Sequence, residues 1–422
     1  MEETKKLAQR KKLNMKLYPI YKMLATDVLF FNAVKVLFLT QVKGISNAQV
    51  VLMETIYAAF KLMLQIPMTV IVSKLGTRKS IIFGNIFWTL EIIIIMCSKN
   101  YFMIIISQLM GAIAWSCKSI AESPMLTKSI PEAQVKGKIF TKLESKGYSK
   151  YCYISAISTV MAGFLYEINP YIPIILAVIF MVLGLIISCN FIDVKEEEHR
   201  TVKQSIEEVK DGLKFIIKSP RLKSLMLMLG FMWGMICLFG TYQTTLLKDI
   251  QVPAKYIGII LAMLDVIQGI SSTKANEFNQ RHKNKSLTYI SLRMALGIAI
   301  AGGVVVIGLW RIPGLAIIIF TYIIRMSDKG VYKIVSRRYM GNFMTPEILT
   351  KIYSIYSIMA SIFRMLIGAV GSYLLTIMAI EEAMVVVGIL CTIITLIFSR
   401  YMKTRIGLKP EEYTKKDLVC MR

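Results

Sequence analysis

The chain has 422 residues, of which 55% are hydrophobic and only 18% charged, and its mean hydropathy is +0.58. The apolar residues come in blocks of about 20, the length at which a helix crosses about 30 Å of hydrocarbon, so a soluble multidomain protein is excluded. The net charge of +25 lies in short clusters between these blocks without a nucleic-acid-recognition module, which indicates membrane topology and excludes nucleic acid as a partner.

The sequence predicts an all-α polytopic membrane protein with twelve transmembrane helices in two six-helix bundles. A basic tail at 1–16 precedes the first bundle at 17–194, a linker at 195–221 leads to the second bundle at 222–401, and a tail at 402–422 follows. The expected spans lie at about 17–39, 47–72, 80–97, 101–124, 148–167, 170–193, 222–246, 256–275, 286–309, 312–334, 350–377 and 381–401.

Lysine and arginine gather in alternate connections between the spans, which predicts that both termini are cytoplasmic. The N-terminal basic segment is expected to be a retained tail, because no small-residue cleavage site follows it. Apolar residues at helical spacing in the linker 195–221 predict an amphipathic helix on the cytoplasmic membrane surface. Localisation in a plasma membrane, of bacterial origin, is the expectation from this pattern together with the abundant isoleucine and lysine.

Ionisable groups inside the spans are the first candidates for mechanism, because each costs at least about 2.5 kcal/mol near the bilayer centre. Asp27 and Lys35 in the first span would lie about 80° apart on one continuous helix, close enough to reach one cavity. Asp27 is a candidate for binding a proton or cation, and a structural ion pair with a lysine is the alternative. Lys118 and Glu122 are spaced for an intrahelical ion pair, which serves either a gate or packing.

The second half carries further candidates for substrate or ion binding: Tyr242, Gln243, Asp265, Arg325 and Arg364. Arg325 and Asp328 lie one turn apart, which predicts that they pair. Arg364 has no acid beside it along its span, so it needs either Asp265 or Asp27 from another helix or an anionic ligand. For the polar residues of the seventh span, simple helix packing is the competing interpretation.

The short stretch "SKLGTRKS" at 73–80 is expected to form the cytoplasmic turn after the second span. Gly76 permits a tight turn, and Lys74, Arg78 and Lys79 are gating candidates that would meet acids on the other half of the chain. This stretch within "IVSKLGTRK" resembles the loop G-x-L-x-D-R-x-G-R-R of the major facilitator superfamily, with Ser73 where that family has Asp.

A second motif, "DGLKFIIKSPRLKSLML", resembles the entry to span seven in drug-efflux and macrolide-efflux members of the same superfamily. The resemblance implies two halves around a central cavity lined by spans one, four, seven and ten. The chain departs from proton-coupled members in the fourth span, where "SQLMG" has Ser107 in place of Arg. The coupling ion therefore stays open.

The resemblance implies a monomeric secondary transporter that exports small amphipathic or drug-like compounds by alternating access, driven by a proton or cation gradient. Two alternatives are an uptake permease or facilitator for a small nutrient and a membrane binding protein that does not transport. An enzyme is not expected, because the two histidines fall in loops and no catalytic constellation can be assembled. No cofactor or metal is expected, and no nucleotide-binding G-x-x-x-x-G-K-[ST] loop occurs.

Overall fold

The computed structural model describes the backbone of residues 2–130, 136–192, 207, 220–282, 285–309, 312–341 and 346–405. Within these ranges the chain forms helices and no strand, as the apolar blocks predict. The predicted linker at 195–221 lies outside the described residues apart from 207 and 220–221, and so does the C-terminal tail from 406 onward.

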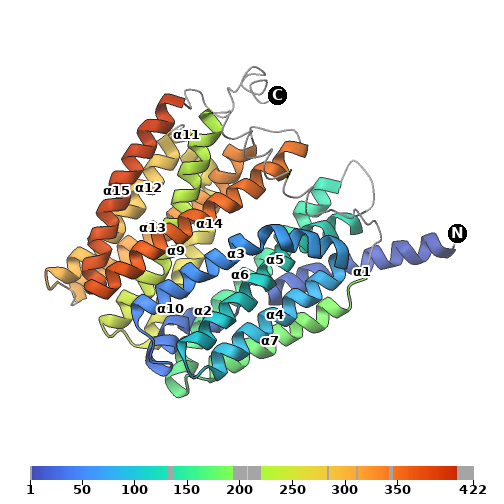
Figure 1. The fold of residues 1–422 in the computed structure, drawn as a ribbon, viewed down its shortest axis with the longest axis horizontal. Helices are drawn as coiled ribbons and strands as arrows, with labels where there is room; N and C mark the ends of the chain where they lie inside the picture. Colours follow the sequence, from blue (N-terminus) through green and yellow to red (C-terminus); the bar gives the residue numbers. More distant parts are fainter. Residues whose placement is uncertain are drawn as a thin grey trace. The chain divides into compact units, whose positions relative to one another are not determined.

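The helices follow the predicted spans closely (Figure 1). The first half of the chain forms α1 (Glu2–Ala25), α2 (Phe31–Leu37), the π-helix η1 (Phe38–Val42), α3 (Asn47–Leu75), α4 (Thr77–Cys97), α5 (Tyr101–Ser129), α6 (Lys136–Ile168) and α7 (Ile172–Cys189). The second half forms α9 (Pro220–Asp249), α10 (Ala254–Thr273), α11 (Ala275–His282), α12 (Ser286–Val306), α13 (Ile312–Gly341), α14 (Pro346–Ile377) and α15 (Ile380–Arg405). Every predicted span after the first overlaps one long helix.

Ten helices among the described residues are long and apolar enough to cross a bilayer. Helices α1 and α13 are not among them: α1 overlaps the first predicted span only over 17–25, while α13 coincides with the tenth. In α13 the apolar run is interrupted by Arg325, Asp328, Lys329 and Lys333. A span that carries this many charges is costly in lipid and must turn them toward protein or water. The twelve-span count and the cytoplasmic termini stay predictions.

The first predicted span is not the single helix that its hydropathy suggests. Helix α1 ends at Ala25, and α2 begins only at Phe31. Between them Phe30 has φ of 63°, a left-handed conformation that is unusual for a bulky side chain. The prediction of one continuous helix over 17–39 was therefore wrong, and with it falls the angular argument that placed Asp27 and Lys35 on one helix face.

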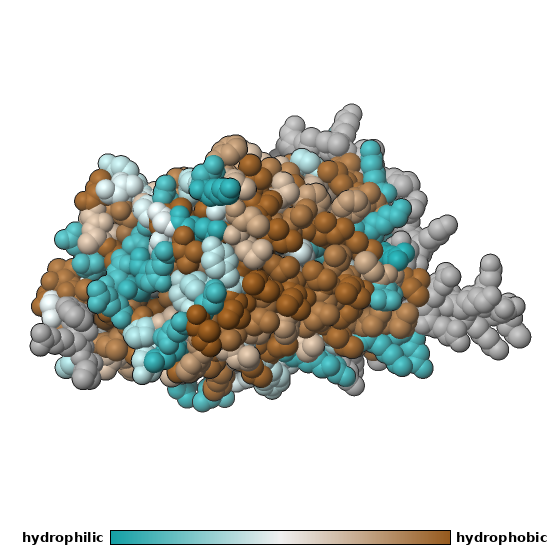
Figure 2. Space-filling view, turned by 90° about the horizontal axis from the view of Figure 1, so that it is seen from below, coloured by the Kyte–Doolittle hydropathy of each residue, from teal (hydrophilic) through white to brown (hydrophobic). Residues whose placement is uncertain are grey.

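The outer surfaces of the helices are apolar. Figure 2 shows hydrophobic side chains crowded over one face of the molecule, and large side chains such as Met63, Phe102 and Ile168 are 72%, 71% and 74% exposed. Exposed apolar surface of this extent is not tolerated in water and marks contact with another apolar phase. Lipid supplies that phase for a multi-pass membrane protein.

The helices group into two compact units. Unit 1 comprises Met1–Ile45, Phe60–Ser205 and Ala254–Ala262, and unit 2 comprises Ser46–Ala59, Ile206–Pro253 and Met263–Arg422. In unit 1 helices α1, α4 and α5 bury a common core that includes Tyr18 and Tyr21. In unit 2 helix α9 packs against α14 and α15, and α12 packs against α13 and α15. The predicted domain boundaries at 194 and 222 stay a prediction.

Two long helices contribute to both units. The first part of α3 belongs to unit 2, where the Ser372 hydroxyl on α14 donates to the Ala48 carbonyl at 2.8 Å. The first part of α10 belongs to unit 1, where Gly258 lies against the Thr159 backbone of α6. Small residues at these contacts let the backbones approach closely, as in other membrane helix pairs. Each unit is thus built from both halves of the sequence.

A matched pair of glycines tests the packing of α12 on α15. A Cβ atom at Gly302 would lie 2.4 Å from the Glu381 backbone oxygen, whereas at Gly303 it would meet only Val385 at 4.0 Å. We expect Gly302→Ala to lower the free energy of unfolding by about 1–3 kcal/mol, because backbone must move. Gly303→Ala should be neutral or stabilising by up to about 1 kcal/mol, since alanine favours helix. Thermal unfolding of the two purified variants measures this, and equal midpoints would contradict the predicted contact.

Candidate functional site

Asp27 lies in the interruption between α1 and α2 and is held by three donors. Its Oδ1 accepts hydrogen bonds from the Val28 amide at 2.8 Å and from Asn32 Nδ2 at 2.7 Å. Its Oδ2 accepts from the Tyr151 hydroxyl of α6 at 3.4 Å. Broken helices in transporters place carboxylates and free backbone groups where ions and substrates bind. The carboxylate of Asp27 therefore stands at a position of this kind, while Lys35 lies beyond the break on α2.

The C-terminus of α1 is capped by a lysine from another helix. The Nζ of Lys118 on α5 donates to the Ala25 carbonyl and to Asn85 Oδ1, the latter at 3.0 Å. The ammonium group also lies 4.0 Å from the ring centroid of Trp88. Cations are favoured at helix C-termini and over tryptophan faces. These contacts explain how a lysine that is only 4% exposed remains in the interior.

Glu122 joins this lysine to a second one. Its Oε1 accepts from the Tyr21 hydroxyl at 2.7 Å and lies 3.8 Å from Lys118 Nζ, which is the ion pair that the i, i+4 spacing predicts. Its Oε2 lies 2.6 Å from Lys22 Nζ. Lys22 in turn reaches Glu144 of α6 at 3.5 Å. We call Lys22, Lys118, Glu122 and Glu144 the α1–α5 ion cluster.

The charges of this region do not balance. Asp27 lies within electrostatic range of Lys118, so it belongs with the ion cluster. Together these five groups contain three carboxylates and two ammonium groups. One additional proton or monovalent cation brings their sum to zero, while solvent screens part of the charge of Glu144, whose side chain is 36% exposed. The arrangement can therefore bind a proton or a small cation without further change in the chain.

The acids and bases of unit 2 pair differently from the sequence prediction. Asp328 does not pair with Arg325: its carboxylate accepts from Arg293 of α12, with Arg293 Nε at 3.1 Å from Oδ2. Arg325 instead donates to Gln243 Oε1 on α9. The spacing of one turn failed as a guide because a neighbouring helix supplies a closer partner, which sequence spacing along one helix cannot show.

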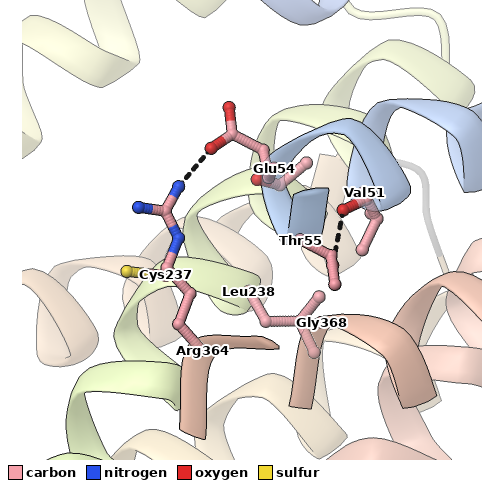
Figure 3. Close-up of a pocket in the computed structure, with 8 residues that line it drawn as sticks. Val51, Glu54, Thr55, Cys237, Leu238, Arg364 and Gly368 are labelled. Atoms are coloured by element: carbon pink, nitrogen blue, oxygen red, sulfur yellow. Dashed lines mark hydrogen bonds and ion pairs between the residues drawn. The ribbon is translucent and has the colours of Figure 1, made fainter. Parts of the chain in front are cut away.

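Arg364 also has a partner that differs from the predicted ones. Its guanidinium donates to Glu54 Oε2 on α3, and not to Asp265 or Asp27 (Figure 3). The guanidinium lies 5.1 Å from the Tyr57 ring centroid as well. Glu54 comes from the part of α3 that belongs to unit 2, so this pair ties the first half of the sequence to the second.

The Glu54–Arg364 pair borders a small pocket in unit 2, whose cavity volume is about 20 Å³. Its lining residues come from α3, α9 and α14: Val51, Glu54, Thr55, Cys237, Leu238, Thr241, Arg364 and Gly368. The space has room for about one water molecule, with an ion pair on its wall.

Tyr242 has a packing role in the structure. It is fully buried, and its hydroxyl donates to the Gly371 carbonyl of α14 at 2.8 Å. Gln243 faces α13 as the acceptor for Arg325. The assignment of Tyr242 and Gln243 to substrate binding stays a prediction. The Gln243 side chain contacts a charged group, whereas the Tyr242 hydroxyl contacts a backbone carbonyl.

The turn between α3 and α4 has the expected form. Gly76 has φ of 80°, which favours glycine, while Lys74 and Lys79 are exposed. Arg78 donates to the Cys189 carbonyl at the end of α7 at 2.8 Å, which caps that helix. The gating role of these residues stays a prediction.

Lys43, in the connection between η1 and α3, is a second helix cap. Its Nζ donates to the Met96 and Ser98 carbonyls at the end of α4, at 2.7 and 2.9 Å. Burial lowers the pKa of this ammonium group below its ordinary value. The distribution of charges along the sequence predicts topology, but it does not reveal that Lys43 caps a helix.

Some residues of the charged sites were not identified from the sequence. Lys329 lies one turn after Arg325 on α13, and Asn85 and Trp88 of α4 surround Lys118. For Lys329 the spacing to Arg325 was a usable signal. For Asn85 and Trp88 no signal existed, since an asparagine and a tryptophan within an apolar span are equally consistent with packing.

A family model described as Major Facilitator Superfamily matches residues 19–327, about three quarters of the chain. Solved structures with the same fold include the nucleoside transporter NupG, which is 9% identical over 96% of this chain and 100% of its own, with a TM-score of 0.69. A D-xylose–proton symporter is 12% identical over 95% and 98%, with a TM-score of 0.67. A bacterial homologue of the human lysosomal transporter Spinster, inward-facing and unoccupied, is 12% identical over 95% of this chain and 98% of its own, with a TM-score of 0.67. No curated protein sequence matches the chain.

Proposed function

The chain belongs to the Major Facilitator Superfamily, a transporter and not an enzyme, and from this premise we propose that it is an ion-coupled secondary transporter in a bacterial plasma membrane. We propose further that it works as a monomer with twelve spans and cytoplasmic termini. The substrate is a small amphipathic or drug-like compound, and transport is by alternating access.

One observation carries the coupling: Asp27 at the broken first helix, next to the α1–α5 ion cluster. The surplus carboxylate among these five groups gives a place for a proton or monovalent cation inside the bundle. Ionisable groups are retained inside membrane segments chiefly where ions or protons pass. The coupling site therefore rests on unit 1 alone and does not depend on the substrate.

The direction of transport rests on a different support. The junction "DGLKFIIKSPRLKSLML" resembles that of drug-efflux and macrolide-efflux members, which favours export. Uptake of a small nutrient is the second candidate, because the fold relatives are named as nucleoside, D-xylose and peptide-binding transporters. At 8–13% identity those relatives share the fold only, so neither substrate nor direction follows from them.

Proteoliposomes with an imposed proton or sodium gradient test the proposal. The full chain is reconstituted, and a panel of drugs, sugars, amino acids and peptides is screened first for ligand-dependent thermal stabilisation and then for flux. We expect accumulation of at least one amphipathic compound that stops when an ionophore dissipates the gradient. Binding confined to one polar nutrient class would favour uptake, and flux that ignores both gradients would refute coupling.

A further inference from the structure

Helix α13 of unit 2 carries three cations in succession, of which Arg325 is buried and the other two are half-buried. Arg325, Lys329 and Lys333 follow one another at i, i+4 spacing on α13, so all three project from one side of the helix. Like charges at this spacing repel one another even on a water-exposed helix. Inside a membrane protein the repulsion is stronger, because the surroundings screen it less.

The nearby acids are already engaged elsewhere. Asp328 is paired with Arg293, and Glu54 is paired with Arg364. Asp265 on α10 is the one carboxylate of the described residues that lies within electrostatic range of both Arg325 and Lys329. Lys333 and Arg325 are both cations within electrostatic range of Lys329. Asp265 is one acid near the two cations Arg325 and Lys329, so positive charge is in excess at this pair.

The same region has hydrogen-bond donors without acceptors. Arg325 is 5% exposed and Gln243 is 1% exposed, and their side chains are in contact. Within the described part of the chain, neither Arg325 Nε nor Gln243 Nε2 finds an acceptor. Lys329 is half-buried, and Asp265 is the one described carboxylate within electrostatic range of it. Buried donors are almost always satisfied, so adjacent unsatisfied donors indicate that an acceptor is missing.

The small pocket of unit 2 lies near these donors. Cys237 of α9 lines the pocket beside the Glu54–Arg364 pair, and it lies within electrostatic range of Arg325 and Lys329. Trp233, one turn earlier on α9, stacks on Tyr332 of α13 with ring centroids 6.5 Å apart. At this position an anionic group would meet the unsatisfied donors of Arg325 and Gln243.

We propose that the substrate carries a carboxylate or phosphate group, and that Arg325, Lys329 and the Gln243 amide bind it. The cations and donors of α9 and α13 form an anion subsite, which we name the α13 anion subsite. Lys329 is the residue that distinguishes it, since Arg325 also has a protein partner. The inference rests on the proposed transport function and adds the chemical class of its substrate.

Four naphthalene derivatives of matched size test this with the purified full-length protein: 1-naphthoate, 1-naphthyl phosphate, 1-naphthylmethanol and 1-naphthylmethylammonium. Equilibrium dissociation constants are measured by calorimetry in lipid nanodiscs. We expect one or both anions to bind at least about tenfold more tightly than the neutral alcohol, as charge-assisted hydrogen bonds would give. The carboxylate and phosphate arms decide between the two anionic groups.

Variants locate the binding. Lys329→Gln and Arg325→Gln should weaken anion binding by about tenfold to a hundredfold and leave the alcohol unchanged, which also shows that the variants fold. Lys329→Arg should retain anion binding, and Lys223→Gln, at an exposed lysine of α9, is the matched control. Anion affinity that does not exceed that of the alcohol, or that survives Lys329→Gln, would overturn the subsite. Gradient-driven flux of the cationic derivative with no anion binding would overturn it too, while leaving the transport function intact.

Discussion

Replacing Asp27 by asparagine is expected to abolish gradient-driven accumulation in proteoliposomes, by about a hundredfold, while the protein folds normally. The fold should survive because an asparagine oxygen can still accept from the Val28 amide and the Asn32 side chain. What is lost is the negative charge that binds the driving proton or cation, and charge-assisted bonds contribute about 1.5–3 kcal/mol each. Accumulation under an imposed gradient is the measurement.

Substrate exchange separates coupling from substrate binding in the same variant. Exchange of labelled for unlabelled substrate needs no net ion movement, so Asp27→Asn should retain it. Asp249→Asn is the matched control, because that carboxylate lies at the end of α9 beside Lys248 at 2.7 Å and outside the ion cluster. Unchanged accumulation would remove Asp27 from the mechanism, and loss of exchange together with accumulation would place it in substrate binding.

The long helices were predictable from the sequence because lipid imposes a length and a composition on any segment that crosses it. The expected span at 47–72 is α3 (Asn47–Leu75), and the one at 101–124 is α5 (Tyr101–Ser129), which extends to its basic end. The interruption after Ala25 was not predictable. Hydropathy is averaged over many residues, so a short interruption does not change it. Residues 26–30, which leave the helix, are apolar apart from Thr26 and Asp27.

Partners of buried charges were predictable only within one helix. Lys118 and Glu122 pair as their spacing requires, because four residues bring side chains to the same helix face. Arg364 and Asp328 found partners on other helices, at Glu54 and Arg293. Those contacts depend on how helices pack, and several acids in neighbouring spans satisfy the sequence equally well.

The two units have opposite charge imbalances, and this agrees with our proposal that a cation drives the transport of an anionic substrate. In unit 1 the five groups around Asp27 have a surplus carboxylate, whereas in unit 2 the donors around Lys329 lack an acid. A cation bound in one and an anion in the other would each relieve a buried charge. Coupling requires in addition that binding of one ion tightens the binding of the other, which titrating the anion at several cation concentrations would measure.

Replacing Glu122 by glutamine is expected to lower the free energy of unfolding by about 3–5 kcal/mol, the cost of removing one partner from a buried ion pair. Glu122 lies between Lys22 and Lys118, and its removal leaves two ammonium groups facing each other without the acid that separates them. The exposed acid Glu167, whose carboxylate lies 3.8 Å from Lys255, is the matched control: Glu167→Gln should cost at most about 1 kcal/mol.

The double variant Glu122→Gln with Lys118→Gln decides whether the effect is one of charge. Glutamine at both positions removes one cation with its acid, so stability should recover by about 1–3 kcal/mol relative to Glu122→Gln alone, a coupling that neighbours in one network show. Chemical unfolding of the four proteins gives the coupling energy directly. Additive losses would mean that Glu122 acts through its hydrogen bond from Tyr21 and not through its charge. The α1–α5 ion cluster would then lack an acid on which its cation-binding role depends.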